Sequence, residues 1–330
     1  MSFLVTLTPS GHTFSCEANE TLLDAALRSG VNISYHCATG GCGECKAKII
    51  AGRVKDYRHH DFVIPEAEKI THTVLMCSVS AASDLVVEAS EAVTAQDIPL
   101  QQIAVKVAKI DRVNDGNLIL HLRTPRSKTL RFLAGQYVQA AIPGGAAANF
   151  YIASCPCNGM VIQLHVQRSN LPFNAFAFAQ LKAGDSLGIS GPFGDFTLDE
   201  DSRRPIVMVA EDTGFAPLKS LIEHALALDL PQSMQLYWMV GEGQAHYQDN
   251  YCRSWEDALD GFVYHPLRIK RSANGDNDYQ DAAEFVLGRT PVESEIDLYL
   301  AGSGRMLEFF KEAFVKKGTP ADRIRLAKPA

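Results

Sequence analysis

Four cysteines constrain the fold of this chain more than any other feature of its sequence. Three of them lie in the run Cys-Ala-Thr-Gly-Gly-Cys-Gly-Glu-Cys at 37–45, and the fourth is Cys77. The glycines in the run permit positive φ angles and close approach of the backbone, because glycine has no Cβ atom. We therefore expect a tight loop whose sulfur atoms converge with that of Cys77.

The spacing of Cys37, Cys42, Cys45 and Cys77 is C-x4-C-x2-C followed by a distant cysteine, which is typical of plant-type [2Fe–2S] ligand sets. Zinc is one alternative, since Cys42 and Cys45 also form a C-x2-C pair. Structural zinc sites usually combine two such pairs, however, and Cys77 stands alone. Metal-free buried thiols are the other alternative. We predict the binuclear cluster, which transfers one electron at a time.

The residues around this loop predict an α+β unit. Alternating apolar residues on both sides of Ser10-Gly11 indicate a β-hairpin. Apolar residues at 22, 23, 26 and 27 follow the period of a helix, with Asn19 as its expected N-cap and Gly30 as its stop. Strands are expected at 46–50 and 84–88. We interpret residues 1–95 as a β-grasp ferredoxin domain that holds the cluster.

The remaining sequence predicts two further domains. A chain of 330 residues is long enough for two to three, and residues 92–101 form the expected linker. Short alternating strands, among them 103–110 and 118–122 around the turn Asn-Asp-Gly at 114–116, indicate an antiparallel β-barrel over 100–200. Buried strands at 206–210, 235–240 and 297–300, each followed by a helical pattern, predict an α/β domain with a parallel sheet over 203–330.

Composition limits the location and the partners that we expect. No apolar run reaches the roughly 18 residues of a membrane helix, and no signal segment precedes the first strand, so we expect a cytoplasmic protein without membrane insertion. No basic stripe suggests a nucleic-acid partner. The net charge of −7 lies mainly in residues 1–98. This charge either steers the domain toward a basic redox partner protein or only aids solubility.

The order of these features resembles the ferredoxin–NAD(P) reductase-like oxidoreductases that carry an N-terminal [2Fe–2S] domain. The resemblance covers nearly the whole chain. Besides the cysteine loop, the matching motifs are Leu-Ala-Gly-Gln-Tyr-Val at 133–138, Ile-Ala-Ser at 152–154, Gly-Pro-Phe-Gly at 191–194 and Thr-Gly-Phe-Ala-Pro at 213–217. The family includes reductase components of bacterial oxygenases and hydroxylases, and flavoproteins that reduce CDP-6-deoxy-glucoseen intermediates.

The resemblance implies the cofactors and the site residues. An FAD is expected between the barrel and the α/β domain, and NAD(P)H is expected at the α/β domain. In the family, electrons leave through the cluster to an oxygenase, a hydroxylase or a similar acceptor protein. The residues implied for the flavin are Phe150, Tyr151, Ile152, Ala153 and Ser154, and those implied for the nicotinamide nucleotide are Thr213, Gly214 and Gly302.

The flavin motifs of the family are altered in this chain. Aligning Ile-Ala-Ser at 152–154 with the family places Ala148 where an arginine binds the flavin pyrophosphate. A one-residue deletion would restore Tyr151 as the motif tyrosine, but it would reverse the alternation of side chains along the strand. The phosphate-binding turn at 169–175 lacks its glycine. Arg168 either replaces the missing positive charge or is an ordinary surface residue.

The nucleotide motif is altered as well. Asp212 replaces the first glycine of Gly-Thr-Gly-Phe-Ala-Pro, and we expect it to cap the helix that follows. Its charge would oppose a phosphate by about 4 kcal/mol at 4 Å and an effective dielectric near 20. Ala-Gly-Ser at 301–303 lacks the family cysteine, and the last five residues lack the aromatic side chain that covers the flavin. Either substituted contacts hold the cofactors, or the chain has lost NAD(P)H and FAD binding and acts as an electron carrier or docking subunit.

Two further groups of residues have open interpretations. Cys155 and Cys157 form a C-x-C pair after the Ile-Ala-Ser motif, and they are either ordinary loop thiols or a redox-active pair. Arg268, Lys270 and Arg271 either hold the 2′-phosphate of NADPH or belong to a solvated loop. The sequence thus predicts the cluster site in detail and leaves the flavin and nucleotide sites to be tested.

Overall fold

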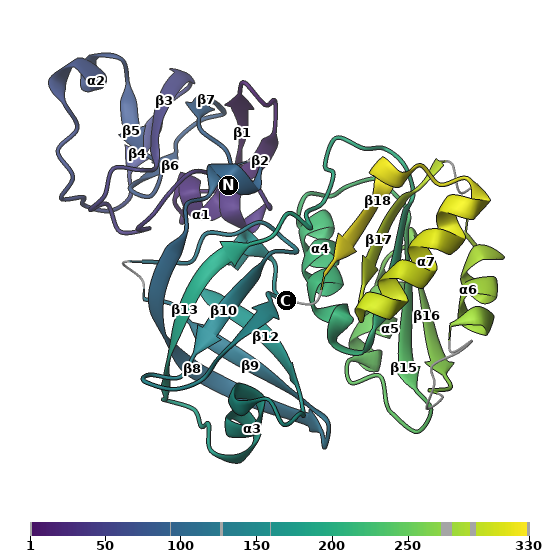
Figure 1. The fold of residues 1–330 in the computed structure, drawn as a ribbon. Coiled ribbons are helices and arrows are strands. Elements are labelled where there is room, and N and C mark those ends of the chain that lie inside the picture. The colour runs from purple at the N-terminus through teal and green to yellow at the C-terminus, as the bar shows by residue number, and fades with distance from the viewer. Residues whose placement is uncertain are drawn as a thin grey trace.

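The fold consists of three β-sheet units that follow one another along the chain (Figure 1). It was obtained as a computed structural model, which describes residues 2–92, 94–125, 128–158, 160–271, 279–290 and 295–328. An α+β unit at the N-terminus is followed by an antiparallel barrel and then by an α/β unit with a parallel sheet. The multidomain fold class expected from the sequence is confirmed. Among the described residues, no helix is long and apolar enough to cross a membrane.

The N-terminal unit is a mixed five-stranded sheet with the order β2-β1-β7-β3-β5, against which helix α1 packs. Strands β1 and β7 are parallel and the other neighbours are antiparallel. Strands β4 and β6 form a separate pair. The elements are β1 (Ser2–Thr8), β2 (Thr13–Glu17), α1 (Leu22–Arg28), β3 (Lys46–Ala51), β4 (Val54–Asp56), α2 (Glu66–Ile70), β5 (Thr73–Leu75), β6 (Val79–Ala81) and β7 (Leu85–Ala89).

Helix α1 begins at a different cap from the expected one. The side chain of Thr21 accepts a hydrogen bond from the Asp24 N–H at 3.0 Å, which satisfies a free N–H group in the first turn. The expectation that Asn19 caps this helix is therefore wrong. Gly30 follows the helix with a φ of 78°, the left-handed conformation in which helices commonly end.

The second unit is a six-stranded antiparallel sheet with the order β11-β10-β13-β8-β9-β12, which curls into a nearly closed barrel. A bridge between Ile152 and Leu164 joins its two edges. The short helix η1 (Ala95–Asp97) precedes it within the expected linker. The elements are β8 (Gln101–Asn114), β9 (Asn117–Arg123), β10 (Tyr137–Ala141), β11 (Ala147–Tyr151), η2 (Pro156–Asn158), β12 (Val161–Gln167), α3 (Pro172–Ala179) and β13 (Ser186–Phe193).

Side-chain alternation along β12 gives the barrel two distinct faces. Ile162, Leu164 and Val166 are fully buried in the barrel core. Because successive side chains of a strand point to opposite faces, the residues between them face outward. One of these, His165, is nevertheless buried, because the α/β unit covers this face.

The third unit is a parallel sheet with the order β16-β15-β14-β17-β18. Helices α4 and α5 pack on one face, and α6 and α7 on the other (Figure 1). The strand order reverses between β14 and β17, and open α/β sheets bind ligands at such a reversal. The elements are β14 (Ile206–Glu211), η3 (Asp212–Gly214), α4 (Phe215–Ala227), β15 (Met234–Gly241), α5 (Asp249–Ala258), β16 (Phe262–Ile269), α6 (Gln280–Leu287), β17 (Asp297–Ala301), α7 (Gly304–Lys317), η5 (Ala321–Arg323) and β18 (Ile324–Ala327).

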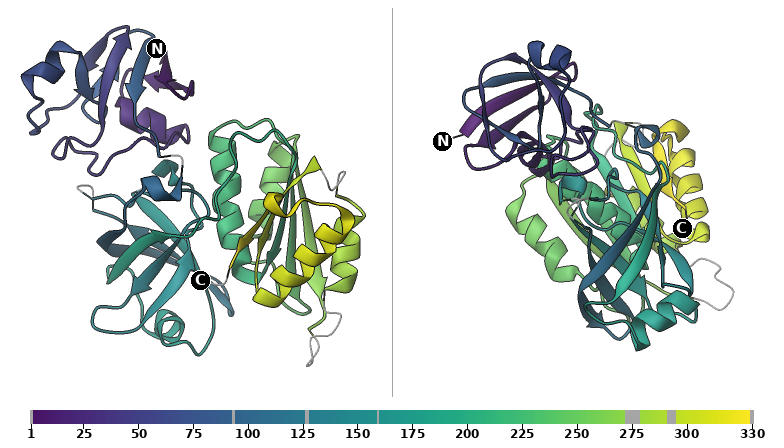
Figure 2. Two further views of the ribbon diagram at one scale, coloured as in Figure 1. Left: turned by 45° about the horizontal axis from the view of Figure 1, so that its top comes forward. Right: turned by 90° about the vertical axis from the view of Figure 1, so that its left-hand side faces the viewer.

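The three units meet around helix α4, and Figure 2 shows them from two further directions. Leu228, which directly follows α4, packs against the core of the N-terminal unit. A Cβ atom on Gly30 would lie 3.0 Å from Leu228 Cγ, so the Leu228 side chain packs closely against the Gly30 backbone. Arg131 of the barrel donates a hydrogen bond to Ser34 Oγ at 3.4 Å. These contacts hold the N-terminal unit against the other two.

Candidate metal centre and cofactor cavity

The loop that carries three of the four predicted cluster ligands is closely packed. Gly40 and Gly43 have φ angles of 83° and 79°. A Cβ atom on Gly40 would collide with His60, and one on Gly43 would collide with the ring of Phe62. Only glycine fits at these two positions, so the loop can wrap tightly under the segment that contains His60 and Phe62.

The four thiols form two pairs, one within this loop and one between the loop and Cys77. The Cys42 thiol acts on the pKa of Cys37, and the Cys45 thiol acts on the pKa of Cys77, so each thiol lies beside its partner. Cys37, Cys45 and Cys77 are buried, and Cys42 is partly exposed. No three His, Cys, Asp or Glu side chains in the described part of the chain form a site for one metal ion. Two pairs of thiols are instead the donor set of a binuclear cluster, in which each iron takes two cysteines.

The electrostatics of the loop favour thiolates. A hydrogen bond from Cys45 lowers the pKa of Cys77 to about 6. Burial of Cys37 opposes its ionisation, but backbone N–H groups of the loop and the Cys42 thiol bring its pKa down to about 7. Within each pair the second proton is harder to remove, because the pKa of Cys45 and that of Cys42 are raised. Bound iron would supply the positive charge that stabilises the second thiolate.

A second candidate site is a cavity of about 360 Å³ between the outer face of the barrel and the carboxyl ends of β14 and β17. It lies at the reversal of strand order, where the fold class places ligands. Its volume falls within the usual range of small-molecule sites. The lining residues are Asn149, Phe150, Tyr151, His165, Gln167, Glu211, Asp212, Thr213, Gly214, Pro217, Arg271, Ala301, Gly302, Ser303, Ala327 and Lys328.

The cavity includes some of the residues that the sequence suggested and leaves out others. Phe150, Tyr151, Thr213, Gly214 and Gly302 line it. In contrast, the Ile-Ala-Ser motif at 152–154 lies beyond strand β11, which ends at Tyr151.

The next three residues turn away from the cavity because the chain leaves the strand there. Ile152 is fully buried in the barrel core. The carbonyl groups of Ala153 and Ser154 accept hydrogen bonds from Lys219 Nζ at 3.0 Å and from Ser220 Oγ at 2.7 Å. Both donors belong to α4, so this stretch fastens the barrel to the α/β unit.

An ion pair occupies the part of the cavity where β14 ends. The Asp212 carboxylate pairs with the guanidinium group of Arg271. Asp212 has a φ of 50°, and Trp238 Nε1 donates a hydrogen bond to its carbonyl at 2.9 Å. Helix α4 has no side-chain cap, so the expectation that Asp212 caps it is wrong. Burial raises the pKa of Asp212, and Arg271 only partly offsets this effect.

Glu211 connects the loops that follow β14 and β17 at the cavity, a role that the sequence did not indicate. Its carboxylate accepts hydrogen bonds from the Ser303 N–H at 3.0 Å and from Tyr279 Oη at 2.9 Å. A Cβ atom on Gly214 would collide with the Ala301 carbonyl, so the loops after β14 and β17 touch through their backbones. The base of the cavity is therefore rigid.

A buried histidine supplies the cavity with a free polar atom. His165 is 4% exposed, and its Nδ1 lies 2.8 Å from Tyr247 Oη. Burial holds the pKa of Tyr247 well above and that of His165 well below the ordinary value. Tyr247 therefore donates to a neutral imidazole, which places the imidazole proton on Nε2. Nε2 has no hydrogen-bond partner.

Tyr151 closes another side of the cavity. Its hydroxyl donates a hydrogen bond to the Lys328 carbonyl at 2.8 Å, which fixes the C-terminal segment against the barrel. Its ring makes an edge contact with that of Tyr137 at 5.6 Å. An aromatic ring, a free N–H donor and glycine-containing loops fit the ring system of a flavin or a nicotinamide.

The same cavity offers little positive charge to a phosphate. Among the described residues of its lining, the basic side chains are Arg271 and Lys328, and Arg271 is already paired with Asp212. Arg168 does not take the place of the missing family arginine. Its Nε donates to the Asp115 carbonyl at 2.5 Å, and its guanidinium group lies 4.3 Å from the centre of the Phe178 ring. The cavity thus fits the rings of the expected cofactors better than their phosphates.

Known proteins resemble this chain in both sequence and structure. Residues 5–82 match the family model described as a 2Fe-2S iron-sulfur cluster binding domain. The chain is 32% identical over 329 residues to the CDP-6-deoxy-L-threo-D-glycero-4-hexulose-3-dehydrase reductase of Yersinia pseudotuberculosis serotype I, covering 98% of this chain and 97% of that protein. It is 28% identical over 266 residues to reductase component 1 of the terephthalate 1,2-dioxygenase of Comamonas sp, covering 80% and 78%.

Among solved structures, the Amycolatopsis cytochrome P450 reductase GcoB has the same architecture. It superposes with a TM-score of 0.62 and is 27% identical, with 99% of this chain and 98% of that chain covered. The similarity therefore extends over all three units, including those that form the cavity.

Proposed function

Because this chain belongs to the ferredoxin–NAD(P) reductase-like oxidoreductases with an N-terminal [2Fe–2S] domain, we propose that it passes electrons singly to an oxygenase- or hydroxylase-type partner protein. The observation that supports this most directly is the pairing of Cys37 with Cys42 and of Cys45 with Cys77. When bound by these thiolates, a [2Fe–2S] cluster supplies one-electron transfer. The loop contributes negative charge and backbone N–H donors in a largely buried site.

In this proposal, the cavity between the barrel and the α/β unit holds the ring system of FAD. A bound flavin supplies the link between two-electron donors and one-electron acceptors. His165, with its unpartnered Nε2, and Tyr151, with its ring, would lie beside the ligand. Pro217 and the backbone of Gly302 line the opposite side and exclude water.

NAD(P)H is proposed to enter beside η3. The phosphate groups of the nucleotide would compete with Asp212 for Arg271, a basic side chain of the cavity lining. Since Arg271 partly neutralises Asp212, the opposing free energy is smaller than that of an unpaired carboxylate. Thr213 and Gly214 present their backbone to the ligand. We propose this as a reductase site with substituted contacts.

The alternative proposal is an electron carrier or docking subunit that does not oxidise NAD(P)H. The Asp212–Arg271 ion pair favours it, because the pair occupies the position where a phosphate would bind. In either case we propose a cytoplasmic location. The four ligand cysteines are free thiols, as iron binding requires, and thiols stay reduced in that compartment.

An anaerobic absorbance titration distinguishes the two proposals. The reductase should contain flavin and cluster, and both should bleach on addition of NADH or NADPH. The carrier should show the cluster spectrum alone, without a response to either nucleotide. Dithionite serves as the control, since it should reduce the cluster in both cases. Protein that lacks iron and gives no EPR signal after dithionite would refute both.

A further inference from the structure

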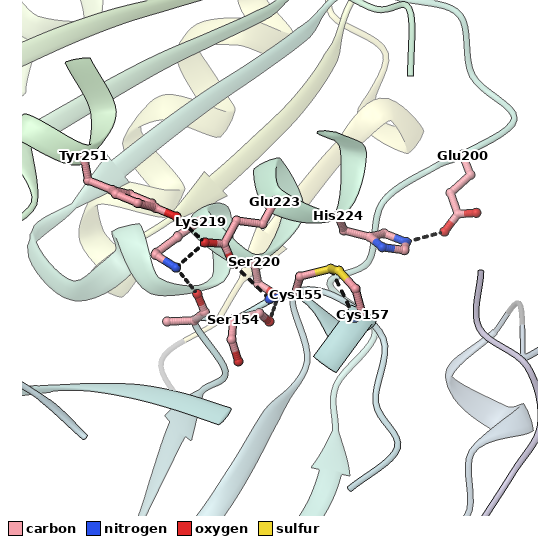
Figure 3. Close-up of a disulfide and its surroundings, with 10 residues drawn as sticks. Ser154, Cys155, Cys157, Glu200, Lys219, Ser220, Glu223, His224 and Tyr251 are labelled. Atoms are coloured by element: carbon pink, nitrogen blue, oxygen red, sulfur yellow. Dashed lines mark hydrogen bonds and ion pairs between the residues drawn. A yellow bond between two sulfur atoms is a disulfide. The ribbon is translucent and has the colours of Figure 1, made fainter. Parts of the chain in front are cut away.

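The loop that follows the Ile-Ala-Ser motif contains a disulfide. Cys155 and Cys157 are joined across Pro156, with their Cα atoms 5.2 Å apart (Figure 3). Both residues are partly exposed. The Cys157 N–H also donates to Cys155 Sγ at 3.2 Å. Of the two interpretations that the sequence left open, the structure therefore favours a bonded pair over independent loop thiols.

The two cysteines of this disulfide differ in bonding from the other cysteines of the chain. Cys155 and Cys157 are bonded, whereas the remaining six are free thiols, and four of these are needed as thiolates for iron. A protein that assembles such a cluster must do so where dithiols stay reduced. Disulfides that form in such compartments are usually transient, catalytic or redox-sensing. Partial exposure also makes a disulfide accessible to thiol exchange.

We propose that Cys155 and Cys157 are a redox-active dithiol–disulfide couple that exchanges electrons with a protein or small-molecule dithiol. A thiolate of the dithiol attacks one of the two sulfur atoms, which breaks the bond and forms a mixed disulfide. The second thiolate of the dithiol then displaces the cysteine. Two electrons and two protons pass to the pair, and the dithiol leaves as a disulfide.

The couple lies where the three units of the molecule meet. On one side, helix α4 holds its loop: Glu223 Oε2 accepts from the Cys155 N–H at 3.0 Å, and Ser220 Oγ donates to the preceding Ser154 carbonyl at 2.7 Å (Figure 3). Glu223 is itself held by Lys219 Nζ and by Tyr251 Oη. The loop is therefore fastened to α4 independently of the sulfur–sulfur bond.

On the other side, η2 lies against helix α1 of the cluster-binding unit. Reduction opens the small ring between Cys155 and Cys157 and frees η2, while the α4 hydrogen bonds up to Cys155 remain. We infer that the thiol state of the couple changes the packing of η2 against α1. The couple is thus a modification site at the contact between the cluster-binding unit and the barrel.

Differential alkylation of the full-length, cluster-containing protein tests the redox activity. The protein is equilibrated with oxidised or reduced dithiothreitol without denaturant, then alkylated, and its peptides are analysed by mass spectrometry. The peptide with Cys155 and Cys157 should take up two labels after reduction and none after oxidation. Cys16 and Cys252 are the internal controls, since both are buried free thiols and should stay unlabelled in either state.

Two results would overturn this proposal. Labelling of both cysteines in the oxidised sample would show that no disulfide forms. Labelling only after denaturation would show a structural disulfide that dithiols do not reach. In either case the cluster, followed by its absorbance, can remain intact, so the proposed electron-transfer function would survive.

Hydrogen exchange tests the effect on the junction. Exchange in α1 should be faster in the reduced protein than in the oxidised protein. The double variant Cys155→Ser/Cys157→Ser should match the reduced protein in both conditions. The matched control is Cys252→Ser, which leaves the couple intact and should keep the redox difference. Identical exchange of α1 in the oxidised and reduced wild type would refute the inferred change in packing.

Discussion

The cluster loop and the cofactor cavity are built in opposite ways. All four proposed cluster cysteines lie between residues 37 and 77, and three of them belong to one loop. The cavity is lined by residues from both the barrel and the α/β unit, between positions 149 and 328. The loop keeps its complete donor set. The cavity differs from the family motifs at several positions. The clearest is Asp212, an acidic residue that pairs with Arg271.

The difference shows how well each kind of site tolerates amino-acid substitutions. A binuclear cluster needs four thiolates, and no neighbour can replace one that is lost. A flavin or a nucleotide is held by many weak contacts, so one contact can disappear while another takes its place. We therefore expect single substitutions to abolish iron binding but only to adjust ligand affinity at the cavity.

Cys77→Ala gives the largest expected effect. The variant should lose nearly all of its cluster iron, because the Cys45–Cys77 pair can no longer hold its iron atom. Iron analysis and the EPR signal after dithionite measure the loss. The control is Cys16→Ala, which removes a buried thiol of the same unit that lies outside the cluster loop. A Cys77 variant with a full cluster would contradict our assignment of ligands.

Asp212→Gly should strengthen nucleotide binding. It removes the nearer of the two carboxylates that Arg271 contacts, while Glu211 Oε1 remains at 3.5 Å. We expect a gain of about tenfold to a hundredfold in affinity for NADH or NADPH, less than an unpaired carboxylate would give because Arg271 already neutralises part of the charge. Calorimetric titration of the full-length protein measures it.

Asp229→Gly is the matched control for this variant. Asp229 also has a positive φ, of 52°, but it lies beyond the end of α4. Glycine relieves the same backbone conformation at both positions. Only the Asp212 variant should bind nucleotide more tightly. Equal affinities of wild type and both variants would show that the ion pair does not block the phosphate position.

His165→Leu should weaken FAD binding by about tenfold, the value of one net hydrogen bond. Tyr247→Phe should have a smaller effect of the same sign, because Tyr247 acts by orienting His165. The double variant should lose little more than His165→Leu alone, since both changes remove one interaction. Flavin fluorescence during titration of the apoprotein measures the affinities.

Gln163→Leu is the control for this series. Gln163 lies on the same outer face of β12, but it does not line the cavity. Its substitution should leave FAD affinity unchanged. Additive losses for His165 and Tyr247, or a loss in the Gln163 variant as large as that for His165, would argue against a specific hydrogen bond from Nε2.

The smallest expected effect is a pH dependence of nucleotide binding. Burial raises the pKa of Asp212, so this carboxylate becomes neutral at a higher pH than an exposed one. As pH falls through that raised pKa, the negative charge of Asp212 is lost and affinity should rise, by less than about tenfold per pH unit for one proton. Binding to Asp212→Gly should lack this component. A wild-type affinity that falls toward acid pH would contradict the assignment.

Local patterns in the sequence predicted the parts of the molecule that depend on near neighbours. The cysteine spacing, the hairpin at Ser10-Gly11 and the turn at 114–116 are each set by a few adjacent residues, and the structure has strands and turns at these places. The cap of α1 was assigned to Asn19, two residues too early, because both Asn19 and Thr21 are good capping residues.

Contacts between distant segments were not predictable in this way. Asp212 and Arg271 come from the ends of β14 and β16, and His165 and Tyr247 come from different units. Their meeting depends on strand order and on the docking of the α/β unit against the barrel. The outward position of His165 on an alternating strand was the one available signal, and it does not identify the partner.

Helix α4 fixes a spacing within the molecule. It begins at the cofactor cavity, binds the C-x-C loop through Ser220 and Glu223, and ends where Leu228 enters the core of the N-terminal unit. Its 13 residues span about 20 Å at 1.5 Å per residue. One inserted residue would turn everything after it by about 100°. The length of this helix therefore sets the distance between the cavity and the N-terminal unit. Insertions in α4 should be far less tolerated than insertions in the loops.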